Sequence, residues 1–195
     1  MFKRLIRIVV TSHLALAVVS CGGGSRTDDV TARYLEAWRT HDIKTLTEMT
    51  SPDVVLEFGR GTLAGREHII NAVEFSAGAN TTVEIGNIVV RGDTVEFEMA
   101  EKNDIVTACG IEALLHHPRL IFEDGKLVRK GEVKGNRTFR VYAEQLSILR
   151  SWIAKSRPDI LEAITDERGR YKINRRTGEL LAMMARTWHE SKTIE

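Results

Sequence analysis

Residues 31–58, TARYLEAWRTHDIKTLTEMTSPDVVLEF, decide how the fold begins. Residues that can face a core recur there at the spacing of an amphipathic helix, at Val30, Tyr34, Ala37, Trp38 and His41. Asp42 is placed to cap a second, short helix. The apolar run 54–58 follows Pro52 and is typical of a β-strand. The predicted order for this stretch is therefore helix, short helix, strand.

The middle of the chain is rich in strand signals. A turn is expected at 59–61, and a third helix is expected to open at 65–67. Strand-like runs then follow at 82–91, 94–101, 105–115, 119–122 and 126–133. Gly92-Asp93 and Asp124-Gly125 are hairpin-turn signals between neighbouring runs. Apolar and acidic residues alternate along 94–101, which is typical of a sheet with one buried face. Together these patterns predict an α+β fold.

Helical patterns return after Gly135. One helix keeps its apolar spacing over four turns, with Phe139, Tyr142, Leu146, Leu149 and Ile153 on one side. A short helix is expected after Pro158, and a last one is expected to start near Thr177. These helices cannot bury their apolar stripes alone. Residues 135–195 are therefore expected to form a helical extension that packs either on the preceding domain, 28–134, or on a partner.

Several short motifs of this chain resemble those of a known superfamily. They are Tyr34-Leu-Glu-Ala-Trp38, His41-Asp42, Ser51-Pro-Asp-Val-Val55, Gly61-Thr-Leu-Ala-Gly-Arg-Glu67 and Asp124-Gly125-Lys126. The resemblance is to the nuclear transport factor 2-like (NTF2-like) proteins, which include the ketosteroid isomerases and the SnoaL-like polyketide cyclases. It implies a cone over residues 28–134, made of a curved antiparallel sheet packed by the N-terminal helices. Because this superfamily holds enzymes, binding modules and scaffolds, the resemblance specifies fold better than function.

The isomerases of this superfamily provide a chemical test. Their mechanism uses a tyrosine and a protonated aspartic acid as oxyanion donors, and a carboxylate as base. By motif, Tyr34 falls at the tyrosine position, the base position falls on Phe58, and the second donor falls near Pro118. With one group of three present, the resemblance does not imply isomerase chemistry by that mechanism.

A ligand pocket can still be predicted inside the cone. Its expected lining is Tyr34, Trp38, Phe58, Phe97, Met99 and His117. If Leu115 points inward, His117 does too, because strand side chains alternate. A neutral imidazole there would be a base near pH 7, with Tyr34 as hydrogen-bond donor. The alternative is a surface histidine at a strand end, and Tyr34 is either a pocket hydroxyl or a core tyrosine.

The N-terminus is typical of an exported bacterial protein. Three basic residues precede a short apolar run and the sequence Val-Val-Ser-Cys21, and glycines and a serine follow. The run is shorter than the roughly 20 residues that span a membrane. The segment resembles the lipobox of bacterial lipoproteins. This implies a signal peptide at 1–20, a lipid on Cys21, a flexible tether at 21–27, and a place on the periplasmic face of the outer membrane if the source is Gram-negative. An uncleaved anchor and a plain signal peptide are the alternatives.

Composition narrows the choice of partners. Removing residues 1–20 takes away three of 28 basic side chains and no acidic one, which leaves 25 against 27. Such a balance disfavours nucleic-acid binding. With Cys21 acylated, Cys109 has no partner for a disulfide. No HxH, HExxH or cysteine pair is present, so neither a metal nor a cofactor is predicted.

Two functional hypotheses follow from these patterns. In the first, a lipid-anchored envelope protein binds a small apolar ligand in its cone, or pairs with a second copy or another protein. In the second, the domain is an enzyme of the isomerase, cyclase or hydratase type that acts on a hydrophobic small molecule. The second hypothesis uses His117 as base and Tyr34 as donor, so both side chains must reach one cavity.

Overall fold

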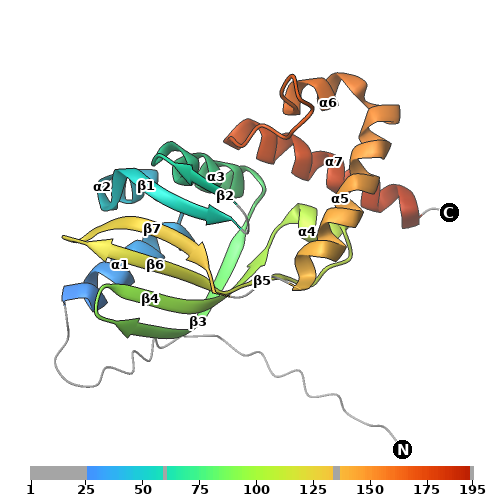
Figure 1. Ribbon diagram of the computed structural model, residues 1–195. Coiled ribbons are helices and arrows are strands. Elements are labelled where there is room, and N and C mark those ends of the chain that lie inside the picture. Colours follow the sequence, from blue (N-terminus) through green and yellow to red (C-terminus); the bar gives the residue numbers. More distant parts are fainter. Residues whose placement is uncertain (1–25, 59–60, 134–136, 194–195) are drawn as a thin grey trace, which may run out of the picture.

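The structure of the protein is a computed structural model, which describes residues 26–58, 61–133 and 137–193. The predictions for the signal peptide, for Cys21 and for most of the tether lie outside the described residues. Figure 1 shows a curved sheet with helices on one face and a group of helices beyond one end. The α+β cone with a helical extension is therefore confirmed.

The first part of the chain follows the predicted order and adds one strand. It forms α1 (Arg26–Arg39), α2 (Ile43–Met49), β1 (Thr50–Phe58), β2 (Gly61–Ala64) and α3 (Glu67–Gly78). Asp42 caps α2 as expected, because its carboxylate accepts a hydrogen bond of 3.0 Å from the backbone N–H of Thr45. The added strand, β2, pairs antiparallel with β1. All four of its residues are exposed, so no alternation of apolar and polar residues reveals it in the sequence.

The sheet has seven strands. The remaining ones are β3 (Thr82–Arg91), β4 (Thr94–Lys102), β5 (Leu114–His116), β6 (Pro118–Glu123) and β7 (Lys126–Glu132). The strand order is β2-β1-β7-β6-β4-β3, and β5 pairs with the far half of β4. The pairing of β1 with β7 is parallel, so the sheet is mixed rather than wholly antiparallel. These two strands are far apart in sequence, so no hairpin fixes their relative direction.

The strand expected over 105–115 is wrong for most of its length. Residues Asp104–Ala108 form a helix, α4, and the strand β5 is confined to Leu114–His116. The side chain of Asn103 caps α4 by accepting a hydrogen bond of 2.9 Å from the backbone N–H of Val106. The cap, together with buried Ile105 and Val106, stabilises the helix over the extended chain that the β-branched residues favour.

The core of the cone lies between the sheet and the first three helices. Its buried members are Tyr34, Leu35, Ala37, Leu46, Met49, Val54, Leu56, Ile69, Val73, Val95, Phe97, Met99, Leu120, Phe122 and Leu127. The inward residues of β4 and β6 follow the period of two that the sequence predicted. In Figure 1, α1 crosses behind the sheet, while the opposite face of the sheet is turned to the viewer.

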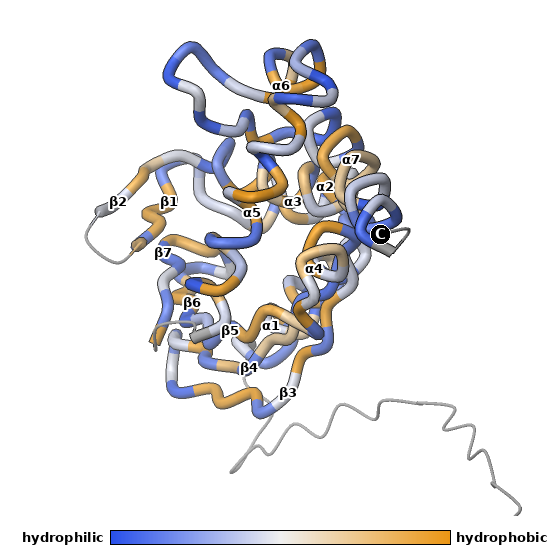
Figure 2. Tube along the Cα trace, turned by 90° about the vertical axis from the view of Figure 1, so that its right-hand side faces the viewer, coloured by the Kyte–Doolittle hydropathy of each residue, from blue (hydrophilic) through white to orange (hydrophobic). Residues whose placement is uncertain are grey.

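The helical extension builds a second core. It consists of α5 (Arg137–Ser156), α6 (Pro158–Ile164) and α7 (Arg175–Thr193). Helix α7 packs on α3 and α4, while α5 and α6 pack on α7 and on each other. Its buried members are Ala79, Ile105, Ala108, Cys109, Leu149, Ile153, Ile160, Ile164, Leu181, Ala182, Met184, Ala185 and Trp188. Figure 2 looks from the side of this extension, and α5 and α6 show both hydrophobic and hydrophilic stretches. Within the described ranges, no helix combines the length and the apolar composition needed to cross a membrane.

Helices α3 and α7 cross at a pair of glycines. A Cβ atom built on Gly78 would lie 2.2 Å from the backbone oxygen of Arg175. A Cβ atom built on Gly178 would lie 2.3 Å from the backbone oxygen of Phe75. Both obstacles are backbone atoms, which a side-chain rotation cannot move. The close approach of α3 and α7 therefore depends on both residues having no side chain, and it joins the extension to the cone.

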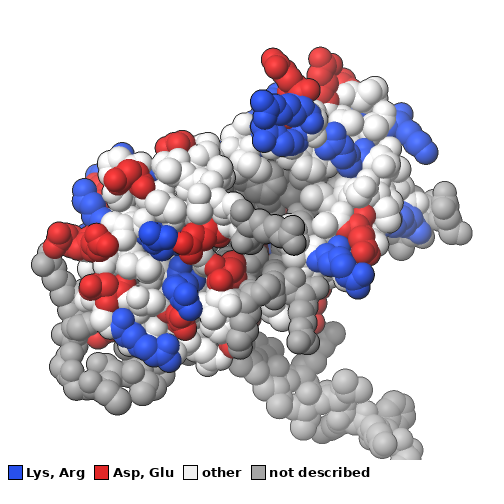
Figure 3. All heavy atoms as spheres, in the orientation of Figure 1, with Lys and Arg blue, Asp and Glu red and all other residues white. Residues whose placement is uncertain are grey.

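The outer face of the sheet is charged. Glu57 on β1 pairs with Arg129 on β7 at 2.6 Å, and Glu96 on β4 pairs with Arg119 on β6 at 2.8 Å. Figure 3 shows acidic and basic side chains interspersed over this face. In the extension, α7 packs against α3 and α4, and the contact of α5 with the sheet is to the short strand β5.

Candidate functional site

A narrow cavity lies inside the cone. It is lined by Tyr34, Leu35, Trp38, Ile85, Phe97, Met99, Pro118, Leu120 and Lys130. The space that the centre of a water molecule can occupy is about 10 Å³. That is room for about one water molecule. A larger ligand would therefore have to displace lining side chains, and Trp38 is one that is only partly buried.

The structure brings together four of the six residues predicted to line a pocket. Tyr34 and Trp38 come from α1, while Phe97 and Met99 come from β4. The helix spacing of the first pair and the strand alternation of the second pair both predicted this convergence. Whether these residues bind a ligand stays a prediction.

Phe58 does not belong to this group. Its side chain is 58% exposed at the end of β1. Leu56 is the last β1 residue that pairs with β7, opposite Lys130. Beyond that point β1 pairs only with the short edge strand β2. The alternation of β1 is thus correct, but the strand continues past the end of the core.

His117 also lies away from the cavity. The condition for its inward orientation fails because Leu115 is 58% exposed, while Leu114 is buried. His117 is engaged through its backbone, whose N–H donates to the Glu132 carboxylate at 2.9 Å. The enzyme hypothesis that needs His117 as a base beside Tyr34 therefore receives no support from this placement.

His116 takes the inward place instead. It pairs with Met99 across β4 and β5, and its side chain is 20% exposed. Its Nε2 atom lies 3.6 Å from Glu101, and its Nδ1 atom lies 3.6 Å from Glu132. The Nε2 atom is buried and has no hydrogen-bond partner among the described residues. Counting back by twos from inward Phe122 reaches His116 rather than His117, so the sequence contained this signal.

Lys130 is the functional candidate that sequence reasoning missed. Simple alternation along β7 from buried Leu127 would place Arg129 inward and Lys130 outward. The pairing of β6 with β7 shifts between Ile121 and Phe122, which leaves Val128 as an extra residue in β7. Such a bulge reverses which side chains face the core beyond it. It turns Lys130 into the cone, opposite buried Leu120.

The amine of Lys130 is held in apolar surroundings. Its Nζ atom lies 3.7 Å from the centroid of the Trp38 ring. Burial lowers the pKa of Lys130 to about 8, although Glu132 and Glu101 act in the opposite direction. No carboxylate of the described chain forms an ion pair with this amine. A lysine with these properties is partly neutral near pH 7 to 8 and can act as a donor or as a nucleophile.

Two carboxylates flank the amine at the open end of the cone. Glu101 accepts a hydrogen bond of 3.0 Å from the side chain of Asn103, the residue that caps α4. Burial alone would raise the pKa of Glu132, but His116, the backbone N–H of His117 and Lys130 together hold that pKa below its usual range. Both carboxylates are therefore positioned by fixed neighbours rather than by direct contact with Lys130.

Tyr34 is a second residue of the cavity wall with a polar group. Its side chain is 1% exposed, and burial raises the pKa of the hydroxyl above its usual range. The hydroxyl approaches that of buried Thr50, but neither oxygen has a hydrogen bond of acceptable geometry within the described residues. The phenol therefore stays protonated at physiological pH and is available to donate.

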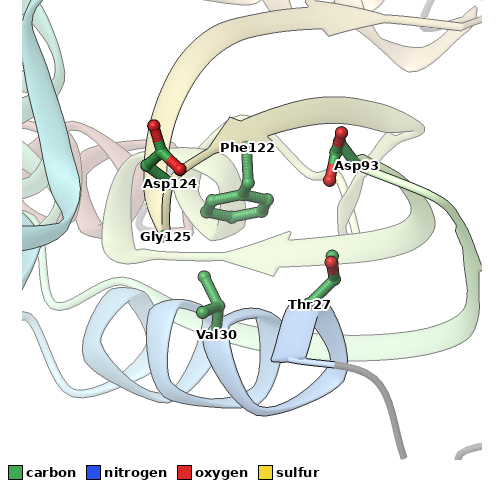
Figure 4. Close-up of a pocket in the computed structure, with 6 residues that line it drawn as sticks. All are labelled: Thr27, Val30, Asp93, Phe122, Asp124 and Gly125. Atoms are coloured by element: carbon green, nitrogen blue, oxygen red, sulfur yellow. The ribbon is translucent and has the colours of Figure 1, made fainter.

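A second hollow opens at the other end of the cone. Figure 4 shows Thr27 and Val30 of α1 facing Phe122, with Asp93 and Asp124 at the turns beside it. Its volume is about 190 Å³, and Gly125 completes its lining. It offers exposed carboxylates and no amine. Over the described residues as a whole, no group of three histidine, cysteine or acidic side chains is arranged to hold a metal ion.

The fold and cavity define a cone-shaped α+β domain that carries a helical extension. The family model for the SnoaL-like domain matches residues 31–130, half of the chain. The chain therefore belongs to the SnoaL-like domain family. A search of curated proteins finds no match.

Solved structures with the same fold are distant in sequence. A Kribbella flavida protein is 13% identical, covers 62% of this chain and 93% of its own, and has a TM-score of 0.51. IdmH from Streptomyces antibioticus is 18% identical, with coverages of 63% and 99% and a TM-score of 0.48. An epoxide hydrolase from M. tuberculosis is 17% identical, with coverages of 67% and 96% and a TM-score of 0.47. At these identities the likeness concerns the fold alone.

Proposed function

We propose that this chain is a lipid-anchored protein of the bacterial cell envelope. Its cone would bind a small, mostly apolar molecule that carries one carbonyl or carboxylate oxygen. The observation that carries the proposal is a cavity with mostly apolar walls, to which Lys130 contributes an amine without a described ion pair and Tyr34 a buried hydroxyl without a described hydrogen-bond partner. Buried polar groups of native proteins are normally paired. A ligand oxygen would supply the missing acceptor.

The chemistry of the cavity favours an acceptor over a donor. The Lys130 ammonium and the Tyr34 hydroxyl both donate hydrogen bonds. The other lining residues are apolar or aromatic, which suits the hydrocarbon part of a ligand. A fatty acid or a hydrophobic carbonyl compound has this combination of groups, whereas an apolar amine does not.

The proposed anchor orients the domain. Helix α1 begins at Arg26, only five residues after Cys21. Five extended residues span at most about 18 Å. Thr27 lies at the end of the cone that carries the turns at Asp93 and Asp124, while Lys130 lies toward the opposite end. A lipid on Cys21 would thus hold the first end near the bilayer and leave the Lys130 end facing away.

Ligand binding can be tested by thermal unfolding with four ten-carbon compounds at pH 7: decanoate, decanal, decanol and decylamine. Decanoate and decanal are expected to raise the melting temperature, and decylamine is not. Lys130→Met should weaken decanoate binding at least tenfold, because a hydrogen bond to a charged group is worth about 1.5–3 kcal/mol. Lys192→Met is the matched control, since Lys192 also lies over a tryptophan ring, that of Trp188.

A second result would overturn the ligand proposal. If none of the four compounds shifts unfolding at millimolar concentration, the cone does not serve as a ligand site of this kind. The better hypothesis would then be that the charged outer face of the sheet forms an interface with a second copy or with another protein. Light scattering of the chain without residues 1–21 distinguishes a monomer from a homodimer.

The lipid anchor has its own test. Metabolic labelling with an alkyne fatty acid in a bacterial host should label the full chain and place it in the membrane fraction. Cys21→Ala should abolish both outcomes, while Cys109→Ala should change neither. Retention of label in Cys21→Ala would refute the anchor without affecting the proposal for the cone.

A further inference from the structure

The Lys130 amine combines three features. It lies 3.7 Å from the centroid of the Trp38 ring, its residue forms part of a cavity wall, and it lacks an ion-pair partner in the described chain. Tyr34 belongs to the same cavity wall, and its buried hydroxyl has no hydrogen-bond partner among the described residues. The wall of one small space thus carries a lysine that can be nucleophilic and a tyrosine whose hydroxyl is unpaired.

We propose that Lys130 forms a reversible imine with the carbonyl carbon of an aldehyde or ketone whose hydrocarbon part occupies the cone. The inference rests on the proposed function, because it assumes that the cavity admits a hydrophobic ligand. It deepens that function by choosing the carbonyl compounds over the carboxylates as the class that the site is built to hold.

The step balances without a further reactant. The neutral amine attacks the carbonyl carbon, and a C–N bond forms as the π bond of the C=O group breaks and its electron pair moves to oxygen. Both amine protons finally leave with the carbonyl oxygen as water, and the product is a C=N bond. The Tyr34 hydroxyl, on a residue of the same cavity wall, would donate a hydrogen bond to the oxygen as charge develops on it. The reverse step, addition of water, releases the ligand unchanged.

The surroundings of the amine favour its neutral form. Burial in the apolar wall lowers the pKa of Lys130 to about 8. The charged and titratable groups around it are Glu101 on β4, His116 on β5, Glu132 on β7 and Tyr34 on α1. Both glutamates favour the ammonium form, and so does the face of the Trp38 ring, so the burial of the amine must outweigh all three.

Other lysines of the chain provide internal comparisons. Lys192 lies 3.0 Å from the centroid of the Trp188 ring, but its residue is exposed and borders no cavity described here. Lys126 lies on the same strand as Lys130 and is exposed at the turn. If a ring contact alone made a lysine reactive, Lys192 would react as fast as Lys130. If a position on β7 alone did so, Lys126 would react as fast as Lys130.

Reductive trapping tests the proposal. The protein is incubated at pH 7.5 with hexanal and sodium cyanoborohydride, which delivers a hydride to the imine carbon and leaves a stable secondary amine. Peptide mapping by mass spectrometry then gives the rate of hexyl addition at each lysine. Lys130 is expected to react at least tenfold faster than Lys126 and Lys192, and hexanoate is expected to slow only the reaction at Lys130.

Variants and pH identify the source of the reactivity. Lys130→Met and Lys130→Arg should both lose the fast reaction. The arginine variant keeps the positive charge, so it remains informative if the methionine variant folds differently. Lys126→Met should retain the fast reaction. The rate at Lys130 should approach a plateau just above pH 8, whereas Nα-acetyl-lysine, with an ordinary pKa of about 10.4, should keep rising to about pH 10.

The outcomes separate this inference from the proposed function. Fast, hexanoate-sensitive labelling of Lys130 supports both. Stabilisation by decanoate or decanal without preferential trapping at Lys130 overturns the imine and leaves ligand binding intact. Uniform labelling of all lysines together with no stabilisation by any compound overturns both.

Discussion

The cone and the helical extension share α3, yet they fill their interiors differently. The cone buries Tyr34 and Thr50 with unpaired hydroxyls, and it holds the Lys130 amine beside a small cavity. The extension also buries one unpaired hydroxyl, that of Tyr171. It relies on alanines and on the crossing at Gly178. Unpaired polar groups near a cavity are characteristic of a binding region, whereas tight packing of small residues is characteristic of a support.

The largest effect is expected from removing the helical extension. A chain that ends at Val133 loses α5, α6 and α7 and exposes the apolar residues of α3 and α4 that face them, Ile105 among them. This should cost more than about 5 kcal/mol, the lower end of domain stability. Size-exclusion chromatography and near-ultraviolet circular dichroism should show an aggregated or loosely packed chain. A monomer with an unchanged unfolding midpoint would instead mean that the cone folds without the extension.

The second-largest effect is expected where α3 and α7 cross. Gly178→Ala adds a Cβ atom that meets a backbone oxygen at 2.3 Å, so we expect a loss of about 3 kcal/mol in urea unfolding. Helix propensity alone would favour alanine by about 1 kcal/mol, so a net loss isolates the contact. Gly86→Ala is the control, because nothing lies within 4 Å of its built Cβ atom. Equal stabilities for the two variants would contradict the close crossing.

The buried amine of Lys130 predicts a pH-dependent change of intermediate size in the stability of the chain. Because its pKa falls from 10.5 to about 8 on folding, the unfolded chain binds more protons between these values. Stability contributed by this site therefore rises from pH 8 to about pH 10.5, and the full penalty is present below pH 8. Each unit by which the pKa changes corresponds to 1.36 kcal/mol of stability. Because the Lys130 side chain is partly exposed, we expect the whole penalty to be about 1–2 kcal/mol.

Lys130→Met removes that penalty. The variant should be more stable than the parent by about 1–2 kcal/mol at pH 7, and the difference should disappear by about pH 10.5. Urea unfolding of both proteins at each pH is the measurement, and the comparison cancels the titration of the tyrosines. A difference that is constant with pH would show that the amine is solvated in the folded state.

The smallest effect is expected on the outer face of the sheet. Glu57 and Arg129 have side chains 45% and 48% exposed, and such pairs contribute about 0.5 kcal/mol. A double-mutant cycle with alanine at both positions should give a coupling energy of that size, which decreases in 0.5 M salt. A coupling above about 2 kcal/mol would mean that this face is less solvated than its exposure indicates.

Much of the fold was predictable because its patterns are local. The spacing from Tyr34 to Trp38, the cap at Asp42 and the hairpin turns each depend on neighbours in sequence. The errors arose where distant contacts decide. Helix α4 is stabilised by burial against α7 as well as by its cap at Asn103. Strand β2 has no buried residue, and among the described strands it pairs with β1 alone.

The site was less predictable than the fold, for one physical reason. Alternation placed Phe97 and Met99 correctly, because β4 keeps its register around them. In β7 the bulge at Val128 reverses the alternation, and no local pattern in 126–132 marks it. The inward orientation of Lys130 therefore became visible only with the strand pairing. The exchange of His117 for His116 followed from taking Leu115 as inward, whereas Leu114 is the buried residue.

The thiol of Cys109 gives experimental access to one part of the molecule, the helical extension. It is 7% exposed within the second core, and burial raises its pKa to about 11. Both properties suppress alkylation while the core stays closed. In a chain without residues 1–21, the rate at which a maleimide labels Cys109 would therefore report transient opening of the helical extension. A ligand bound only in the cone would slow this labelling in proportion to how much of its stabilising effect reaches the extension through α3.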